Sequence, residues 1–171
     1  YDIIGYTDVE DPWEMLQQAV GERNIRATKI AIEKEHLNVE RYEKIQTHFE
    51  EPALVSAEEK LRQLRMIKDE KELSIIREAC KLADFAIEIG VNEITEGKTE
   101  MDVLAAIEYE LKRKGINEMA FSTMVLTGKN AASPHGTPGL TKIQKGDLIL
   151  FDLGVVYEGY CSDITRTVAY Y

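Results

Sequence analysis

Cysteine and long apolar runs are scarce in this sequence. Its 171 residues include two cysteines, Cys80 and Cys161, which form no Cys-x-x-Cys pair and no disulfide framework. A reducing cytosol is therefore the expected compartment. No run approaches the roughly 18 apolar residues of a membrane span, and no signal peptide is visible. We expect a cytoplasmic protein that has no membrane partner.

Basic charge is also in short supply. The chain has 21 Lys and Arg residues against 31 Asp and Glu residues, a formal net charge of −10. A general nucleic-acid binder needs a basic face, so this charge argues against a nucleic-acid partner. The acidic excess mostly serves solubility and identifies no other partner. Hydrophobic residues make up 44% of the chain, which is enough for a normal core, and the length fits one large domain or two small ones.

An initial methionine is missing as well. The chain begins at Tyr1 and stops at Tyr171, directly after a strand-like run. A natural domain seldom ends on the strand that carries its chemistry. We therefore expect a fragment of a longer protein.

Short helical and strand patterns alternate in the first part of the chain. This alternation predicts an α/β layer with a parallel or mixed sheet. A connector with a short helix begins near residue 56, and we place the domain boundary near residue 67. The other expected elements are helices that start at Pro12 and after Asn38, and strands at residues 27–32 and 53–55.

Two longer helices are predicted to open the second domain, residues 68–171. Asp69 with Glu72, and Thr99 with Asp102, have the spacing of capping boxes at helix starts. Glutamates crowd the outer faces of both helices, and because such residues normally stay exposed, we expect solvated surface there. The predicted inward stripe of the first long helix is Leu73, Ile76, Ala79 or Cys80, Ala83, Ile87 and Val91.

The last run, Leu148–Tyr171, predicts two strands folded about Glu158-Gly159, because Ile, Val, Tyr and Thr are frequent in it. With a two-residue loop at that point, opposed residue numbers sum to 317. Residues i and i+2 share a face, so Asp152 and Asp163 share one and are diagonal neighbours, about 7–8 Å apart at the backbone. Carboxylates at that spacing can reach a common point.

Two interpretations of this acid pair stay open at this point. Buried acids so close together repel each other unless a cation or donor compensates, so a metal centre would explain them. Alternatively they are two solvated acids, since antiparallel sheets commonly leave one face wet. In the same register Gly154 lies opposite Asp163 and leaves room at the site. Thr165 lies opposite Asp152, whose carboxylate it can hydrogen-bond and orient.

His135 lies in a loop of turn-forming residues, 128–139, that contains two prolines. Prolines fix the path of a loop, so a positioned imidazole here could bind substrate or transfer a proton near neutral pH. An ordinary polar loop histidine is the alternative. Ser133 and Ser162 lie in no Gly-x-Ser-x-Gly elbow. Cys161 has the parity of the face opposite the acids, where we expect core packing.

Several motifs of the chain match one enzyme family. They are Asp152-Leu153-Gly154, Tyr157, Gly159-Tyr160, Ser162-Asp163-Ile164-Thr165-Arg166-Thr167, Ser133-Pro134-His135-Gly136 and Leu64-Arg65-Met66-Ile67-Lys68. In these motifs the chain resembles the metallopeptidase family that contains prolidase, aminopeptidase P, methionine aminopeptidase and creatinase, and within it the Xaa-Pro branch. The match covers essentially all of residues 56–171, whereas residues 1–55 carry no diagnostic motif.

The resemblance implies an α+β fold. Residues 1–67 would be the last part of an α/β creatinase-type N-terminal domain plus a linker. Residues 68–171 would be the first half of a pita-bread (creatinase/aminopeptidase-like) catalytic domain.

The resemblance also implies five metal ligands, two Asp, one His and two Glu, that bind two divalent ions. Asp152 and Asp163 match the two Asp positions, and His135 resembles the substrate-binding histidine of the family. The ligand histidine and both glutamates come later in family members and would lie beyond Tyr171. The site is thus incomplete, and this chain alone should be inactive. Mn²⁺ is the favoured ion, with Co²⁺ or Zn²⁺ as alternatives.

The implied function of the parent protein is hydrolysis of the Xaa-Pro bond in dipeptides by a metal-activated water, as in a prolidase. The nearest alternative is aminopeptidase P, which acts on longer Xaa-Pro peptides. A metal-free pita-bread binding scaffold and creatinase-type hydrolysis without metal are disfavoured, because such relatives usually lose ligand acids that this chain keeps. We expect the peptide substrate as partner and a homodimer of the full-length protein.

Overall fold

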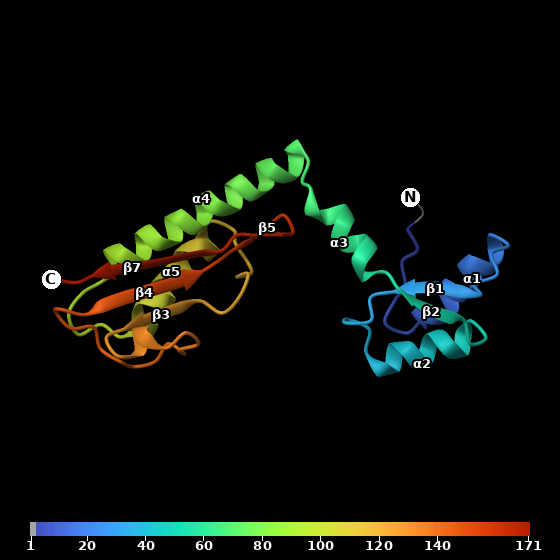
Figure 1. Cartoon of the computed structure of the whole chain (residues 1–171), viewed down its shortest axis with the longest axis horizontal. Helices are drawn as coiled ribbons and strands as arrows, with labels where there is room; N and C mark the ends of the chain where they lie inside the picture. The colour runs from blue at the N-terminus through green and yellow to red at the C-terminus, as the bar shows by residue number, and fades with distance from the viewer. Residues whose placement is uncertain (1–2) are drawn as a thin grey trace. The chain divides into compact units, whose positions relative to one another are not determined.

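Residues 3–171 are described by a computed structural model and form two compact units that divide between Ile67 and Lys68. Figure 1 shows the helices and strands of each unit. The first unit contains α1 (Pro12–Glu22), β1 (Lys29–Ile32), α2 (Val39–His48), β2 (Ala53–Ser56) and α3 (Glu58–Met66). The second contains α4 (Glu70–Asn92), α5 (Glu100–Arg113), β3 (Met124–Thr127), the 3₁₀-helix η1 (Asn130–Ala132), β4 (Leu148–Leu153), β5 (Val156–Tyr157), β6 (Tyr160–Cys161) and β7 (Ile164–Ala169).

The first unit is a small α/β layer, as predicted. β1 and β2 pair in parallel, with Lys29 opposite Ala53. α1 begins at Pro12, and the Asp11 side chain caps it by accepting a hydrogen bond from the backbone N–H of Trp13 at 2.8 Å. α2 is capped in the same way by Asn38.

α3 forms where the short connector helix was predicted. Ala57 occupies the N-cap position without a side-chain hydrogen bond. The hydroxyl of Ser56 donates to the carboxylate of Glu58 instead of capping the backbone. Leu61 and Leu64 remain exposed, Leu64 to 77%.

Both long helices of the second unit begin with the predicted capping boxes. Asp69 accepts from the backbone N–H of Glu72 at 2.9 Å, and the Glu72 carboxylate accepts from the N–H of Asp69 at 2.7 Å. Thr99 and Asp102 exchange the same pair of hydrogen bonds at the start of α5. Each reciprocal pair satisfies backbone donors that have no partner inside the helix.

Of the stripe predicted on α4, only the small residues Ala79 and Ala83 are fully buried. The fully buried positions of the helix are Ala79, Ala83, Ala86 and Gly90, whereas Leu73, Ile76 and Ile87 are half-buried and Val91 is exposed. The reason is close approach of the sheet. A Cβ added at Gly90 would lie 2.6 Å from Cε1 of Phe151 on β4. Small side chains let the helix backbone reach the aromatic ring.

β4 is the central strand of an antiparallel sheet in the order β3-β4-β7. Successive residues of β4 point to opposite faces. Ile149, Phe151 and Leu153 are fully buried and belong to the core that α4 and α5 also line. Leu150 and Asp152 face the other way and are half-buried. The remaining core residues of this unit are Val103, Ile107, Leu111, Ile116, Val125, Ile143 and Val155.

The terminal hairpin folds in the predicted register. Tyr157 faces Tyr160 and Asp152 faces Thr165, so opposed residue numbers sum to 317 along its whole length. Glu158 and Gly159 have φ values of 47° and 82°, which match a two-residue turn of the type I′ family. The hairpin tip is tied to α4, because the Tyr160 hydroxyl donates to the Glu72 carboxylate at 2.7 Å.

Each predicted strand of the hairpin is interrupted once, so that four short strands take the place of two. At the interruption the backbone N–H of Val155 donates to Oγ of Ser162 at 3.1 Å rather than to its carbonyl. The N–H of Ser162 still donates to the carbonyl of Val155 at 3.0 Å. A side-chain oxygen thus replaces one ladder acceptor, which breaks the regular pattern but keeps the register.

Candidate metal centre

Asp152 sits on the sheet face that points away from the helices. Its neighbours along β4, Phe151 and Leu153, point into the core, which places the carboxylate on the opposite side. On β7, Thr165 lies directly opposite and its hydroxyl donates to Oδ1 of Asp152 at 2.8 Å. The hydrogen bond expected from the register is therefore present, and it fixes one carboxylate oxygen of Asp152.

Asp163 precedes β7 and is exposed. It is two residues from Thr165, and so it shares the face of Thr165 and Asp152. The continuous register makes the two acids diagonal neighbours, about 7–8 Å apart at the backbone. Asp152 is half-buried. Among the described contacts, only Thr165 and Asp152 are joined directly, and the place of Asp163 beside them follows from the register alone.

Gly154 has a different role from the one expected. A Cβ added at this residue would lie 1.9 Å from the carbonyl oxygen of Ser162 and 3.1 Å from Cε1 of Phe121. The expectation that Gly154 leaves room for the site is therefore wrong. The hairpin backbone fills that space, and glycine is needed because two chain segments touch there.

His135 is exposed and lies in the loop between β3 and β4. The loop packs onto the acid-bearing face: a Cβ added at Gly136 would lie 2.7 Å from Cδ1 of Leu126. Leu126 is opposite Leu150 on β4, and both share the parity of Asp152. His135 therefore belongs to the same side of the sheet as the acids, although the described contacts do not join it to them.

The residues rejected as nucleophiles have other environments. Ser162 is buried and its Oγ accepts the backbone hydrogen bond from Val155. Cys161 is exposed, so the expectation of core packing is wrong. The reason is that β5 and β6 form a two-stranded ribbon separate from the sheet that carries the core.

The donor chemistry of the acid face fits part of a metal site. Carboxylate oxygens are suitable ligands for Mn²⁺ and related divalent ions. Within residues 3–171, however, no group of three or more His, Cys, Asp and Glu side chains is arranged to hold a metal ion. Asp152 and Asp163 can therefore supply two ligands, and the described residues do not complete a coordination sphere.

Sequence reasoning missed Glu100. It is the first residue of α5 and was expected on the solvated face, but its side chain is fully buried. The carboxylate accepts backbone hydrogen bonds at 2.8 Å from Thr127 and from Gly139, at the two ends of the His135 loop. No sequence signal separates Glu100 from the half-buried Glu108 and Glu110 of the same helix, because its burial depends on a loop that returns from 39 residues away.

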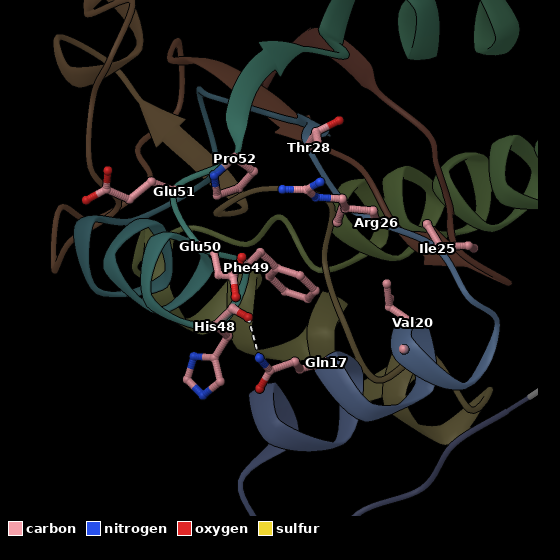
Figure 2. A pocket seen from close by; sticks show the side chains of 12 residues that line it. Gln17, Val20, Ile25, Arg26, Thr28, His48, Phe49, Glu50, Glu51 and Pro52 are labelled. Atoms are coloured by element: carbon pink, nitrogen blue, oxygen red, sulfur yellow. Dashed lines mark hydrogen bonds between the residues drawn. The ribbon is translucent and has the colours of Figure 1, made fainter.

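The first unit contains a separate hollow, shown in Figure 2, at the ends of α1, β1 and α2. The amide of Gln17 donates to the carbonyl of His48 at 2.6 Å on its wall. Glu50 and Glu51, both with φ of 55°, form part of the rim. Nδ1 of His48 lies within hydrogen-bond distance, 2.9 Å, of the carbonyl oxygen of Lys44. None of the predicted site residues lies here.

Comparison with protein families decides the affiliation of the acid-bearing unit. The model of metallopeptidase family M24 matches residues 74–171, more than half of the chain. The chain belongs to family M24. Residues 1–67 match the creatinase/prolidase N-terminal domain. The resemblance inferred from the hairpin motifs and the fold class that it implied are thus confirmed.

Curated relatives and solved structures of M24 proteins agree with this placement. A protein of Bacillus subtilis (strain 168) named "Putative dipeptidase YkvY" is 51% identical over 170 residues, which cover 99% of this chain and 47% of the relative. The X-Pro aminopeptidase of Thermotoga maritima MSB8 superposes with a TM-score of 0.84 at 32% identity, over 95% of this chain and 46% of its own. The prolidase of Pyrococcus horikoshii OT3 superposes with a TM-score of 0.83 at 35% identity, over 94% and 45%.

This M24 chain spans about half the length of the relatives that it matches. The N-terminal family model ends at residue 67, where the first compact unit also ends, and the M24 model begins at residue 74. In the described part of the chain, no helix is long and apolar enough to cross a membrane.

Proposed function

We propose that this M24 chain contributes one wall of the active site of a metal-dependent Xaa-Pro dipeptidase, a prolidase. The observation that carries the proposal is the hydrogen bond by which Thr165 fixes Asp152, on a hairpin whose register makes Asp163 a diagonal neighbour of Asp152. Support comes from the printed names of similar proteins, which include a dipeptidase and a prolidase. In this proposal, residues 1–67 are the last part of the N-terminal domain and residues 68–171 the first half of the catalytic domain.

In this proposal Asp152 and Asp163 hold divalent ions, with Mn²⁺ favoured over Co²⁺ or Zn²⁺. Bound ions of this kind lower the pKa of a water molecule and polarise a carbonyl, which is the chemistry that amide hydrolysis needs. Thr165 would keep the Asp152 carboxylate in a fixed orientation, as hydrogen-bonded neighbours of metal ligands generally do. His135 would bind the substrate near the scissile bond or transfer a proton.

The ligand set would be completed by a histidine and two glutamates outside residues 1–171. Two carboxylates alone bind a divalent ion weakly, because affinity grows with the number of fixed ligands. The isolated chain is therefore expected to be inactive. The complete protein is proposed to act as a cytoplasmic homodimer on Xaa-Pro dipeptides.

Aminopeptidase P activity is the second candidate, favoured by the similarity to the X-Pro aminopeptidase of Thermotoga maritima MSB8. The two functions differ in substrate length, so one assay separates them. The chain, extended by the residues that follow Tyr171 and supplied with Mn²⁺, is incubated with an Xaa-Pro dipeptide and with a longer Xaa-Pro peptide. A prolidase cleaves the dipeptide faster, whereas an aminopeptidase P prefers the longer peptide.

A metal-free pita-bread scaffold is the alternative from another class. The acid pair with its orienting Thr165 speaks against it, because a scaffold has no use for two repelling carboxylates. If the folded and metal-supplied protein hydrolysed neither peptide, the enzyme proposal would be wrong. Binding of the same peptides without hydrolysis would then favour the scaffold.

A further inference from the structure

The loop that carries His135 begins and ends on one buried carboxylate. Oε1 of Glu100 accepts the backbone N–H of Thr127, the last residue of β3, at 2.8 Å. Oε2 accepts the backbone N–H of Gly139, where the loop leaves, also at 2.8 Å. The side chain of Glu100 is fully buried, so water does not compete for these hydrogen bonds.

Asn130 connects the same carboxylate with the interior of the loop. Its Nδ2 atom donates to both oxygens of Glu100 at 3.0 Å and to the carbonyl of Thr137 at 3.2 Å. Four hydrogen bonds to Glu100 thus come from N–H groups, and none of these donors can be replaced by an acceptor without leaving the carboxylate unsatisfied. The loop is thus held at Thr127 and Asn130 before His135 and at Gly139 after it.

Packing fixes the segment next to His135. A Cβ added at Gly136 would lie 2.7 Å from the side chain of Leu126 and 3.2 Å from Oδ1 of Asn130. The N–H of Gly136 donates to the carbonyl of Ser133 at 3.1 Å. Gly136, the neighbour of His135, is thus packed against Leu126 of the acid-bearing face and against Asn130.

We infer that Glu100 is the positioning residue for His135: it closes the ends of the loop and thereby holds the imidazole on the acid side of the sheet. This inference rests on the proposed function for the role of His135 in substrate binding. The loop closure itself follows from the four hydrogen bonds. Glu100 does not contact substrate in this scheme and acts through the loop.

Limited proteolysis of the protein extended by the residues that follow Tyr171, without any metal or substrate, tests the loop closure. Trypsin can cut after Lys129, an exposed residue within the loop, and after Lys145 in the neighbouring turn, which serves as internal standard. Glu100→Gln keeps the shape but turns an NH₂ group toward one of the backbone donors. Cleavage after Lys129 relative to Lys145 should rise at least about tenfold, because hydrogen bonds to a charged group set the population of the open loop.

Asp102→Asn is the matched control. It weakens the same helix start, where Asp102 caps α5, but it leaves the hydrogen bonds to the loop in place. If Glu100→Gln prevents folding, Asn130→Ala provides the second variant, with a smaller increase expected because the two backbone donors remain. Unchanged cleavage after Lys129 in a folded variant, or an equal increase in Asp102→Asn, would overturn the inference.

A double-mutant cycle tests the link to His135 in the longer protein. Glu100→Gln should lower kcat/KM for an Xaa-Pro dipeptide, and should have little further effect in a His135→Ala background. Additive effects would show that Glu100 does not act through His135. If the longer wild-type protein cleaves no Xaa-Pro peptide, the proposed function fails, while the proteolysis result still decides whether Glu100 closes the loop.

Discussion

At the scale of single residues, Thr165 is the side chain whose contribution can be isolated most cleanly. It donates to Asp152 from the neighbouring strand and is itself exposed, so its replacement leaves the core intact. In the proposed centre, Thr165→Val frees the Asp152 carboxylate to rotate. We expect a loss of metal affinity of about 10–100-fold in the longer protein, the usual cost when a hydrogen bond to a metal ligand is removed.

Thr167→Val is the control for this prediction. Thr167 lies two residues further along β7, on the same face, and is also exposed. It is opposite Leu150 rather than an acid. Isothermal titration with Mn²⁺ measures both variants, and equal losses of affinity would mean that the hydrogen bond to Asp152 has no particular importance.

The sequence predicted residues whose positions follow from the period of a strand. The parity of the hairpin was enough to place Asp152 and Thr165 opposite each other on one face. It was not enough for Gly154, which the interrupted hairpin brings against the Ser162 carbonyl, or for Glu100, whose carboxylate binds a segment 39 residues away. The 1.9 Å approach at Gly154 and the buried carboxylate of Glu100 are properties of the assembled backbone.

At the scale of elements, Gly90 sets how closely α4 can approach the sheet. Alanine in a helix interior is normally better than glycine by about 1 kcal/mol. Here the added methyl group would lie 2.6 Å from the Phe151 ring and 2.9 Å from Ile107, and overpacking of a core typically costs about 1–3 kcal/mol. The steric cost outweighs the propensity gain, so Gly90→Ala should lower the free energy of unfolding.

Chemical denaturation measures this change, and Gly21→Ala provides the contrast. Gly21 lies in the last turn of α1, and a Cβ added there would meet nothing within 4 Å. That variant should be neutral or slightly more stable. A stabilised Gly90→Ala variant would show that α4 can move away from β4 at little cost.

The start of α5 should make stability depend on pH. Backbone and side-chain hydrogen bonds from Thr99 hold the pKa of Asp102 below its usual range. A lowered pKa means that the folded state binds its proton later than the unfolded state. The contribution of Asp102 is therefore complete above the unfolded pKa of about 3.9 and is lost as the pH falls through the folded value.

Thermal unfolding between neutral and strongly acidic pH measures this contribution. Asp102→Asn should reduce the acid dependence of the melting temperature, and the two proteins should converge at the acidic end. An acid dependence that is the same in both proteins would contradict the assigned role of the capping box.

Element boundaries were predicted wherever a local signal marks them. Asn38, Asp69 and Thr99 each cap the helix that the sequence assigns to them, and α1 begins at Pro12 as predicted. The interruption of the hairpin strands was not predictable, because it depends on the Ser162 hydroxyl replacing a backbone acceptor. The burial of Ala86 and Gly90 on α4 was also missed, since helical spacing alone does not reveal how near the neighbouring strand lies.

At the scale of the whole molecule, the chain combines a creatinase/prolidase N-terminal unit with an M24 unit and spans about half the length of its relatives. The fold class and the family followed mainly from the long motifs in the last 24 residues of the chain. The order of residues in these motifs is specific to the family. The complete ligand set could not follow from the sequence, because a coordination sphere needs more donors than residues 3–171 bring together.

The central claim is that Asp152 and Asp163 hold divalent metal in the complete protein, and calorimetric titration with Mn²⁺ tests it most directly. The measurement uses the chain extended by the residues that follow Tyr171, with Asp84→Asn on the exposed face of α4 as control. The proposal predicts two bound ions per chain in the wild type and in the control, and loss of metal binding in Asp163→Asn. Undiminished binding of both ions by Asp163→Asn would contradict it.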